Sequence, residues 1–270
     1  MSSPVVLVTG ASRGIGRCIA QRLAAKGATI AVNYRSDDSA ADATLASLQG
    51  TGHLLFKADI GSPAACESLV AAVLERFGRI DALVNNAGVL ERIDVNQCAS
   101  YEAFVEGNRR HLDANATSAS NLMFLVCKAV ASQAPRSPGA SVEGSIQPTP
   151  ADCKCRIVNI SSRSAYQASA VAVTTYAASK AAMSLMSQNL ARTFGRCGIG
   201  FYTVAPTFVL TDMVAGHWDS VKEAVLAQHP SGRIPTGDEI ARAVEWLALE
   251  APLAATGSIV DVNCASHIHH

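Results

Sequence analysis

The stretch that decides the fold of this chain is TGASRGIG, at residues 9–16. It follows a short apolar run and opens a helical pattern. Glycines permit a tight turn and a close backbone approach, and a helix N-terminus offers free N–H groups to a pyrophosphate. The spacing G-x-x-x-G-x-G differs from the G-x-G-x-x-G fingerprint, but the physical requirements are shared. The stretch therefore predicts a dinucleotide-binding turn, with contacts from Gly10, Ser12, Arg13, Gly14, Ile15 and Gly16.

Outward from this turn, apolar runs alternate with helical stretches to the end of the chain. We predict strands at residues 5–9, 29–34, 54–58, 80–85, 156–160, 199–204 and 258–262. We predict helices at residues 15–26, 38–49, 63–77, 174–196 and 237–249, and a mostly helical region at 100–132. Such alternation predicts a doubly wound, Rossmann-like α/β fold, with about seven parallel strands and helices on both faces.

One segment breaks this rhythm. Residues 133–154 are rich in Pro, Ser and Gly and have almost no aliphatic periodicity. Because the β/α alternation resumes in phase after them, we expect a surface loop insertion rather than a domain boundary. The chain is therefore expected to form one dinucleotide-binding and catalytic domain over residues 1–270.

Composition narrows the class of protein. Of 270 residues, 49% are hydrophobic and 16% charged, so little of the chain is expected to be disordered. Lys plus Arg and Asp plus Glu both number 22, which argues against nucleic acid or an anionic membrane as the main partner. This balance leaves little charge to keep molecules apart, so we expect a homo-oligomer. No apolar run is long enough to suggest a membrane span.

The cysteines and the first residues bear on the compartment. The chain enters a strand-like run at once, without a basic leader, so we expect a cytoplasmic location. The eight cysteines are scattered and are expected to be reduced thiols. The only close pair, Cys153 and Cys155, lacks the Cys-x-x-Cys spacing, so we expect no metal site.

The end of the second strand indicates the nucleotide. In a dinucleotide fold an acidic residue there binds the ribose 2′-hydroxyl, whereas an arginine accommodates a 2′-phosphate. Here Arg35 follows the strand, and no acid occurs before Asp37. Arg13, in the glycine turn, could reach the same phosphate. The sequence therefore favours NADP(H) over NAD(H), although Arg35 could also be a solvated strand end.

A pair of residues in the predicted helix at 174–196 indicates the chemistry. Tyr176 and Lys180 lie four residues apart, which places them on one helix face. A nearby ammonium favours the tyrosinate form, so the phenol could exchange protons near neutral pH. The pair Ser161-Ser162, at the end of the fifth strand, offers a hydroxyl that could hold a substrate oxygen. Alone, Tyr-x-x-x-Lys is usually a solvated helix pair.

Together these motifs resemble the single-domain short-chain dehydrogenases/reductases, and the resemblance covers nearly the whole chain. Within that family the chain looks most like the 3-oxoacyl-carrier-protein reductase type, a group with many carbonyl and alcohol substrates. The resemblance rests on the order and spacing of TGASRGIG at 9–16, Asp59, NNAG at 85–88, IVNISS at 157–162, Tyr176-x-x-x-Lys180 and TDM at 211–213.

The resemblance implies catalytic roles. Tyr176 would give a proton to the carbonyl oxygen while hydride arrives from C4 of the nicotinamide. Lys180 would lower the pKa of Tyr176 and hold the nicotinamide ribose. Ser162 would hold the substrate oxygen, and Ser164 is the alternative because the interval to the tyrosine is one residue longer than usual.

Further roles follow for the cofactor and for a proton relay. A family asparagine anchors a water behind the lysine; Asn115 is the candidate and Asn121 the rival, since this region is stretched by about a helical turn on each side. Asp59 and Ile60 would contact adenine. The remaining cofactor contacts would be Asn86, Ala87 and Gly88 near the ribose, Thr211 at the carboxamide, and Pro206, Thr207 and Val209.

Two departures from the family affect the substrate side. Pro206-Thr207 stands where relatives have Pro-Gly, which places a β-branched residue beside the nicotinamide. Residues 263–265 read Asn-Cys-Ala where many relatives have Asp-Gly-Gly. We expect the substrate wall at residues 90–96, 163–169 and 208–229, and the last of these segments, with His217 and Trp218, as a mobile lid.

The leading hypothesis is an oxidoreductase that transfers a hydride between NADP(H) and a carbonyl or secondary alcohol, such as a 3-oxoacyl thioester or similar ketone. A sugar, polyol or steroid dehydrogenase of the same family is an alternative. A non-catalytic NADP(H)-binding regulator is a second class, disfavoured by the intact Ser162, Tyr176 and Lys180. An epimerase or dehydratase is disfavoured because only about 60 residues follow Thr211.

Overall fold

The structure, a computed structural model, describes residues 3–94, 96, 98–133, 153–167, 173–211 and 218–268. The predicted insertion at 133–154 lies almost wholly outside the described residues. Asp212, Met213 and His217 lie outside them as well.

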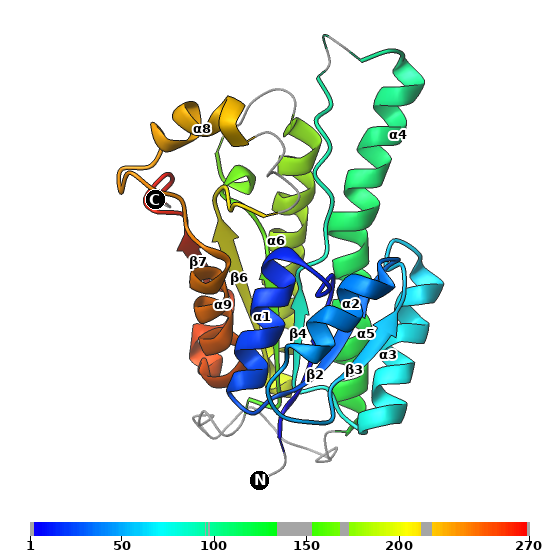
Figure 1. The fold of residues 1–270 in the computed structure, drawn as a ribbon. Helices are drawn as coiled ribbons and strands as arrows, with labels where there is room; N and C mark the ends of the chain where they lie inside the picture. Colours follow the sequence, from blue (N-terminus) through cyan, green and yellow to red (C-terminus); the bar gives the residue numbers. More distant parts are fainter. Residues whose placement is uncertain are drawn as a thin grey trace.

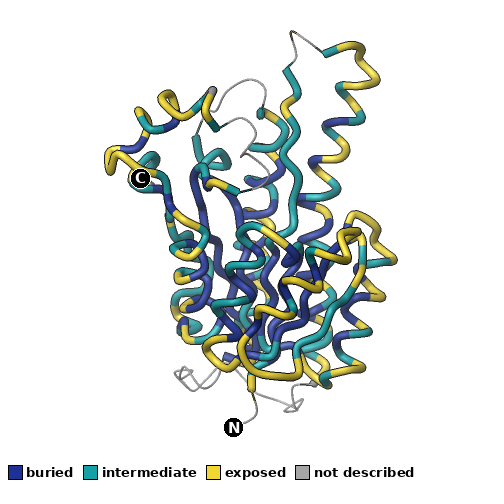
Figure 2. The backbone as a smooth tube through the Cα atoms, in the orientation of Figure 1, coloured by how far each residue is buried: buried dark blue, intermediate teal, exposed yellow. Residues whose placement is uncertain are grey.

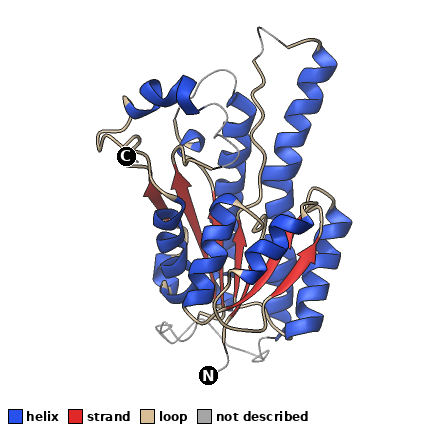
Figure 3. Ribbon diagram, viewed as in Figure 1, coloured by secondary structure: helices blue, strands red, loops and turns tan. Residues whose placement is uncertain are grey.

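A single seven-stranded sheet organises the described part of the chain (Figure 3). Its strand order is β3-β2-β1-β4-β5-β6-β7, and all six neighbouring pairs are parallel. This confirms the predicted doubly wound sheet. The strands are β1 (Val5–Val8), β2 (Thr29–Tyr34), β3 (Leu54–Lys57), β4 (Ala82–Asn85), β5 (Cys155–Ile160), β6 (Ile199–Pro206) and β7 (Ile259–Val262).

Helices cover both faces of the sheet (Figure 1). On one face lie α1 (Gly14–Ala25), α2 (Asp38–Ala46) and α9 (Gly237–Glu245), with α1 packed against α9. The other face carries α3 (Pro63–Phe77), α5 (Ser118–Gln133) and α6 (Thr174–Phe194). In Figure 1, α4 (Tyr101–Leu112) projects beyond the sheet, and α8 (Trp218–Leu226) lies above the ends of β6 and β7.

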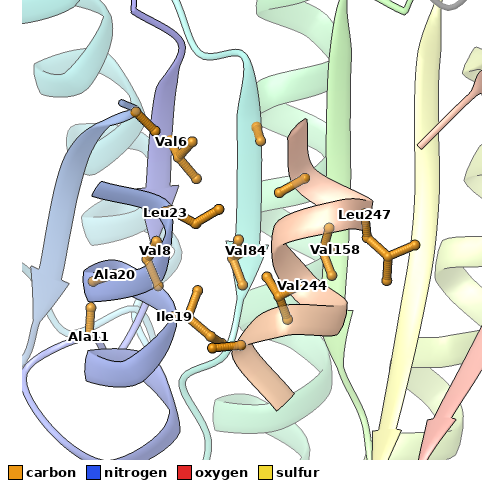
Figure 4. Packing of buried hydrophobic residues seen from close by; sticks show 14 of the residues in the cluster. Val6, Val8, Ala11, Ile19, Ala20, Leu23, Val84, Val158, Val244 and Leu247 are labelled. Atoms are coloured by element: carbon orange, nitrogen blue, oxygen red, sulfur yellow. The ribbon is translucent and has the colours of Figure 1, made fainter. Parts of the chain in front are cut away.

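Burial follows this layered arrangement (Figure 2). Figure 4 shows Val6 and Val8 of β1 packed with Ile19 and Leu23 of α1 and Val244 of α9. All five are fully buried. At about 1.5–3 kcal/mol for each such side chain, this layer is a large part of the driving force that holds the helices to the sheet.

Capping side chains set several helix starts. Ser62 accepts a hydrogen bond from the Ala65 N–H, and Pro63 occupies the first helical position of α3, as predicted. At α9, Thr236 and Glu239 form a complete capping box. These local signals explain why the predicted starts of α3 and α9 agree closely with the structure.

The main differences from the predicted elements concern helix continuity. The helical region at 100–132 is two α-helices joined by a π-helical turn at Asp113–Thr117. The expected helix at 237–249 likewise ends in a π turn, Trp246–Glu250, after α9. The predicted lid contains α8, which hydrophobic periodicity did not identify. Each π turn shifts the apolar spacing by only one position, which a coarse assignment of helical regions does not detect.

The turn after β1 packs tightly against the turn after β4. The Thr9 hydroxyl accepts hydrogen bonds from the backbone N–H groups of Asn86 and Ala87, both at 3.0 Å. The Asn86 amide donates back to the carbonyls of Thr9 and Gly10, at 2.9 and 3.2 Å. A Cβ at Gly16 would lie 2.4 Å from the Gly10 carbonyl oxygen, so glycine is required there.

Gly16→Ala should therefore destabilise the fold by about 1–3 kcal/mol, because the backbone of the turn must shift to relieve the overlap. Urea unfolding of the purified variant measures the effect. Gly195→Ala is the matched control, because a Cβ at Gly195 would meet nothing within 4 Å. Equal stability of the two variants would contradict the close packing described here.

Candidate functional site

The candidate site lies at the carboxyl ends of the parallel strands. β1 and β4 are neighbours at the centre of the sheet, and the chain order reverses between them. In open α/β sheets, ligands bind in the crevice at such a switch point. The predicted site residues follow the ends of β1, β2, β3, β4, β5 and β6, so the topology brings them to one edge of the sheet.

The glycine turn presents an open helix N-terminus. Gly10 and Gly14 have φ of +60° and +55°, which only glycine adopts at little cost. Arg13 is the N-cap of α1, and its side chain makes no capping hydrogen bond. The first N–H groups of α1 therefore lack intrahelical acceptors. Arg17 braces the turn by donating to the Ser12 carbonyl at 2.7 Å.

Two guanidinium groups flank the far end of this turn. Arg13 and Arg35 are exposed, and neither is engaged by another side chain among the described residues. Asp37, the first acid after β2, caps α2 by accepting from the Ala40 N–H at 2.9 Å. The carboxylate of Asp37 is therefore occupied by this capping hydrogen bond at the start of α2. The geometry fits a phosphorylated ribose better than a free 2′-hydroxyl.

The predicted adenine contacts follow β3. Ile60 is buried and Asp59 is exposed. The carboxylate of Asp59 accepts a hydrogen bond from the Gly61 N–H at 3.0 Å, which holds the loop in shape. Nearby, Asn33 of β2 links two strands to the glycine turn: its amide donates to the Phe56 carbonyl at 3.1 Å, and its oxygen accepts from the Gly10 N–H at 3.4 Å.

The catalytic candidates meet where β5 faces the start of α6. Ser162 lies close enough to the phenol of Tyr176 for its hydroxyl to lower the pKa of that group. The backbone N–H of Ser164 donates to the Ser162 hydroxyl at 3.2 Å, which holds that hydroxyl in place. Lys180 is only 4% exposed, and its Nζ donates to the Ile160 carbonyl at 2.7 Å. Of the two candidate serines, Ser162 is the one that acts on the pKa of Tyr176.

The pKa of Tyr176 differs from the sequence-based expectation. Burial raises the pKa of this phenol above its ordinary value, and the Ser162 hydrogen bond offsets only part of the rise. Lys180 does not lower the pKa of Tyr176 here, because its ammonium is directed at a β5 carbonyl. Burial also lowers the pKa of Lys180 to about 8. In this arrangement Tyr176 is a protonated donor near neutral pH.

Asn115 connects the β4 turn to α6. It lies in the π turn and is 1% exposed. Its amide nitrogen donates to the Val89 carbonyl at 3.0 Å and to the Ser179 hydroxyl at 2.9 Å, and its oxygen accepts from the Val89 N–H at 2.8 Å. A Cβ at Gly88 would approach both this oxygen, at 2.8 Å, and Lys180 Nζ, at 3.3 Å. Asn115 rather than its rival Asn121 therefore lies at the site.

The residues after β6 form the remaining wall. Pro206, Thr207 and Val209 are buried, and the Thr207 hydroxyl is 2.9 Å from Nε2 of the buried His229. Thr211 lies across from the glycine turn, since a Cβ at Gly14 would be 3.6 Å from its side chain. Thr207 thus ties this wall to the chain that follows α8. Of the predicted lid, residues 212–217 lie outside the described part of the chain.

Several residues that shape the site were not predicted. Ser184 donates to the Ser161 hydroxyl at 2.9 Å, and Asn159 donates to the Ser187 hydroxyl at 2.9 Å. These bonds fix α6 against β5. The spacing of Lys180, Ser184 and Ser187 on one helix face was a signal that could have identified them.

Comparison with known proteins identifies the family. A model described as enoyl-(acyl carrier protein) reductase matches residues 10–265. The chain is 32% identical over 260 residues to 3-oxoacyl-[acyl-carrier-protein] reductase FabG of Escherichia coli K12, covering 96% of this chain and 95% of that protein. It is 33% identical to D-threitol dehydrogenase of Mycolicibacterium smegmatis, covering 96% and 90%.

The chain belongs to the short-chain dehydrogenase/reductase family. Solved structures of this family share its fold. A short-chain dehydrogenase from Burkholderia cenocepacia in complex with NADP has a TM-score of 0.80, 26% identity and 97% coverage of both chains. A putative short-chain alcohol dehydrogenase from Sinorhizobium meliloti has a TM-score of 0.82, 25% identity and coverage of 98% and 97%. The oxidoreductase class expected from the sequence is thereby confirmed.

Two further properties were searched for in the described residues. No three His, Cys, Asp or Glu side chains there gather as a metal site would require. No helix of that part of the chain has both the length and the apolar composition needed to cross a bilayer. All eight cysteines are described, and all are free thiols.

The lowered pKa of Lys180 predicts a stability that rises with pH. The folded state releases the lysine proton near pH 8, whereas the unfolded chain keeps it to about 10.5. Between these values the unfolded state binds more protons, so the free energy of unfolding increases. Relative to Lys180→Met, the wild type should gain on the order of 2 kcal/mol over this range, measured by urea unfolding.

Lys222→Met provides the control, because Lys222 is exposed on α8. Its difference from the wild type should not change between pH 8 and pH 10.5. If the free energy of unfolding changed with pH by the same amount in the wild type and in Lys180→Met, Lys180 would not be desolvated in the folded protein.

Proposed function

We propose that this protein is an NADP(H)-dependent carbonyl reductase or alcohol dehydrogenase in which Tyr176 exchanges the proton. The observation that carries the proposal is that Ser162, Tyr176 and the buried Lys180 lie together at the same sheet edge as the glycine turn. A protein that only sensed the cofactor would need no proton donor there. This argues against the regulator alternative.

The nicotinamide, when bound, supplies or accepts the hydride at C4. Ser162 would hold the carbonyl oxygen of the substrate next to the Tyr176 hydroxyl. Tyr176 would then donate its proton to that oxygen as negative charge develops there. Lys180 and Asn115 would complete the site, with Lys180 near the ribose and Asn115 behind it, where the Gly88 backbone leaves room.

The choice of NADP(H) rests on the two free guanidinium groups. Arg13, in the glycine turn, and Arg35, directly after β2, are both exposed, and the adenosine ribose is expected near the end of β2. The Burkholderia structure with NADP supports the same cofactor for a protein of this fold. The remaining predicted cofactor contacts keep their proposed roles, since they line one edge of the sheet.

For the substrate we propose a 3-oxoacyl thioester or a similar ketone, on the basis of the named reductase of Escherichia coli. The match to D-threitol dehydrogenase favours a polyol as the second candidate. NADPH oxidation measured against acetoacetyl thioesters, β-keto esters, ketosteroids, diketones and ketoses distinguishes them.

Tyr176→Phe should abolish turnover, with a loss of several orders of magnitude, because the phenyl ring has no proton to give. NADPH binding, measured by fluorescence titration, should be largely retained. Tyr101→Phe is the matched control, because Tyr101 is exposed on α4 and lies outside the site. Near wild-type turnover in Tyr176→Phe would refute the assignment of the proton donor.

Arg35→Asp should shift the nucleotide preference from NADPH towards NADH. A carboxylate repels the 2′-phosphate and accepts a hydrogen bond from the 2′-hydroxyl. The ratio of kcat/KM for the two cofactors measures the shift, which we expect to exceed tenfold. Arg196→Asp, an equal charge change on an exposed residue at the end of α6, should leave the ratio unchanged. An unchanged ratio in Arg35→Asp would eliminate the cofactor argument.

We further propose a cytoplasmic homo-oligomer, a dimer or tetramer, built from single-domain subunits. All seven strands of the described chain join one sheet, which supports one domain. Large apolar side chains are exposed on three helices that contact one another through α6. They are Tyr101, Val105 and Leu112 on α4, Phe124 on α5, and Leu185 and Met186 on α6.

Phe124→Glu tests this surface. Phe124 is 53% exposed, so a charge there should not disturb the core but should weaken an apolar interface. Light scattering after size exclusion should show an oligomer for the wild type and smaller species for the variant. Trp246→Glu, on the opposite face of the sheet, should keep the wild-type mass. A monomeric wild type would refute the proposal.

A further inference from the structure

His111 is a buried residue that the proposed function does not use. It lies in the last turn of α4, four residues before Asn115, and is 1% exposed. Its ring meets the ring of Tyr176 edge to face, with centroids 6.3 Å apart and planes at 70°. A polar side chain in direct contact with the proposed proton donor requires an explanation, because a buried imidazole is costly unless its nitrogens are occupied.

The hydrogen bonds of His111 define its tautomer. The backbone N–H of Glu91 donates to Nε2 at 3.0 Å, so Nε2 carries no proton in this arrangement. The proton of the neutral ring is therefore on Nδ1. Nδ1 is buried without a well-formed hydrogen bond among the described residues, and the Gly107 carbonyl one turn earlier is the nearby acceptor that acts on it.

The charged groups around His111 compensate one another. The Glu91 carboxylate, in the loop after β4, accepts from Arg110 of α4 at 2.7 Å. From α6 the ring of Tyr176 packs against the imidazole, and the pKa of His111 is not shifted by any charged group of that helix. Burial lowers the pKa of His111 below its ordinary value, and the influences of Glu91 and Arg110 on it are opposed. The neutral ring is therefore the form present near pH 7.

A second contact joins α4 to the same end of α6. The Thr175 hydroxyl donates to the side-chain oxygen of Asn108, three residues before His111 on the same helix face. The two contacts hold consecutive residues of α6, Thr175 and Tyr176. Through Glu91, the same face of α4 also holds the loop that begins at the β4 turn.

We propose that His111 is a positioning residue: its neutral Nδ1–H form accepts the Glu91 N–H and fixes both the ring of Tyr176 and the substrate-side loop at residues 89–94. Protonation of Nε2 would turn this acceptor into a donor that faces the Glu91 N–H. The hydrogen bond would then be lost, and the loop at residues 89–94 would be released. This inference rests on the proposed function, because the positioned group is the proton donor.

Two substitutions of His111 distinguish its role as a hydrogen-bond acceptor from the role of its ring in filling space. His111→Gln retains an acceptor oxygen where Nε2 lies but does not titrate. His111→Leu fills the space and accepts nothing. At pH 7.5, kcat should fall about tenfold in His111→Leu and remain within about threefold of wild type in His111→Gln, with the NADPH dissociation constant changed less than threefold in both.

The pH profile provides a readout that a merely structural role would not move. In the direction of carbonyl reduction Tyr176 acts protonated, so its own titration lies above neutrality. The wild type should lose kcat/KM in acid through protonation of His111, at a pH below the ordinary histidine value of about 6.5, because burial lowers the pKa of this ring. His111→Gln should lack this acid limb. His53→Asn is the control, because His53 accepts the Ile30 N–H at 3.0 Å at the opposite end of the sheet and should keep the limb.

Nitrogen NMR of the histidine side chains tests the tautomer without any substrate, so its outcome is independent of whether turnover is found. The signal that disappears in His111→Gln should show protonated Nδ1, and it should shift in Tyr176→Phe. Protonated Nε2, equal losses in the Gln and Leu variants, or an unchanged acid limb in His111→Gln would overturn the proposal. If His111→Leu does not fold, the pH profile of His111→Gln and the NMR signal of His111 still test the proposal.

Discussion

The side-chain amide of Asn115 is the constraint on which the rest of the site depends. It makes three hydrogen bonds, two to the backbone of Val89 and one to Ser179. Because the amide is buried, losing any partner would leave a polar atom unsatisfied at a cost of about 1–3 kcal/mol. The amide therefore holds the cofactor half of the molecule, which ends at the β4 turn, against the catalytic half, which begins at α6.

The geometry of the chain makes this link possible. The π turn at Asp113–Thr117 directs Asn115 towards α6, and Gly88 leaves the space in which its oxygen approaches Lys180. Single π turns within α-helices are frequently found at functional sites. On the other side of α6, the serine contacts to β5 fix the same helix. The helix that carries Tyr176 and Lys180 is thus held by polar bonds on two sides, and Lys180 is buried between them.

Burial also sets the electrostatics. It raises the pKa of Tyr176 and lowers that of Lys180 to about 8, so the pair favours a protonated phenol and a weakly held lysine proton near pH 7. This state suits proton donation to a carbonyl oxygen. Oxidation of an alcohol requires the tyrosinate, which a positively charged nicotinamide close to Tyr176 would favour.

Much of the fold was predictable because parallel strands and their helices differ in period and length. The runs at 29–34 and 156–160 are short, mostly apolar and rich in β-branched residues, and they lie within one residue of β2 and β5. Asn115 could be predicted only through the family resemblance. The π turn at Asp113–Thr117 was not predicted, since a single extra residue shifts the apolar spacing by only one position within a long helical region.

Three features of the site depend on contacts between segments far apart in the sequence. The contact of His111 with Tyr176 and the bond between Thr207 and His229 join residues 65 and 22 positions apart, and no local pattern marks them. The sequence predicted that Lys180 lowers the pKa of Tyr176, whereas burial raises it. Helical spacing places Lys180 near Tyr176 but does not show that its ammonium donates to the Ile160 carbonyl of β5. These are tertiary effects, which periodicity and propensity do not encode.

The most direct test of the central claim follows the hydride itself. NADPH carrying deuterium at one face of C4 is used to reduce a β-keto thioester in ordinary water, and the product is analysed by mass spectrometry. A hydride transfer with Tyr176 as proton donor predicts one deuterium on the carbinol carbon from one of the two labelled faces. A product that gains its new C–H hydrogen from solvent, or that carries no deuterium from either face, would contradict this mechanism.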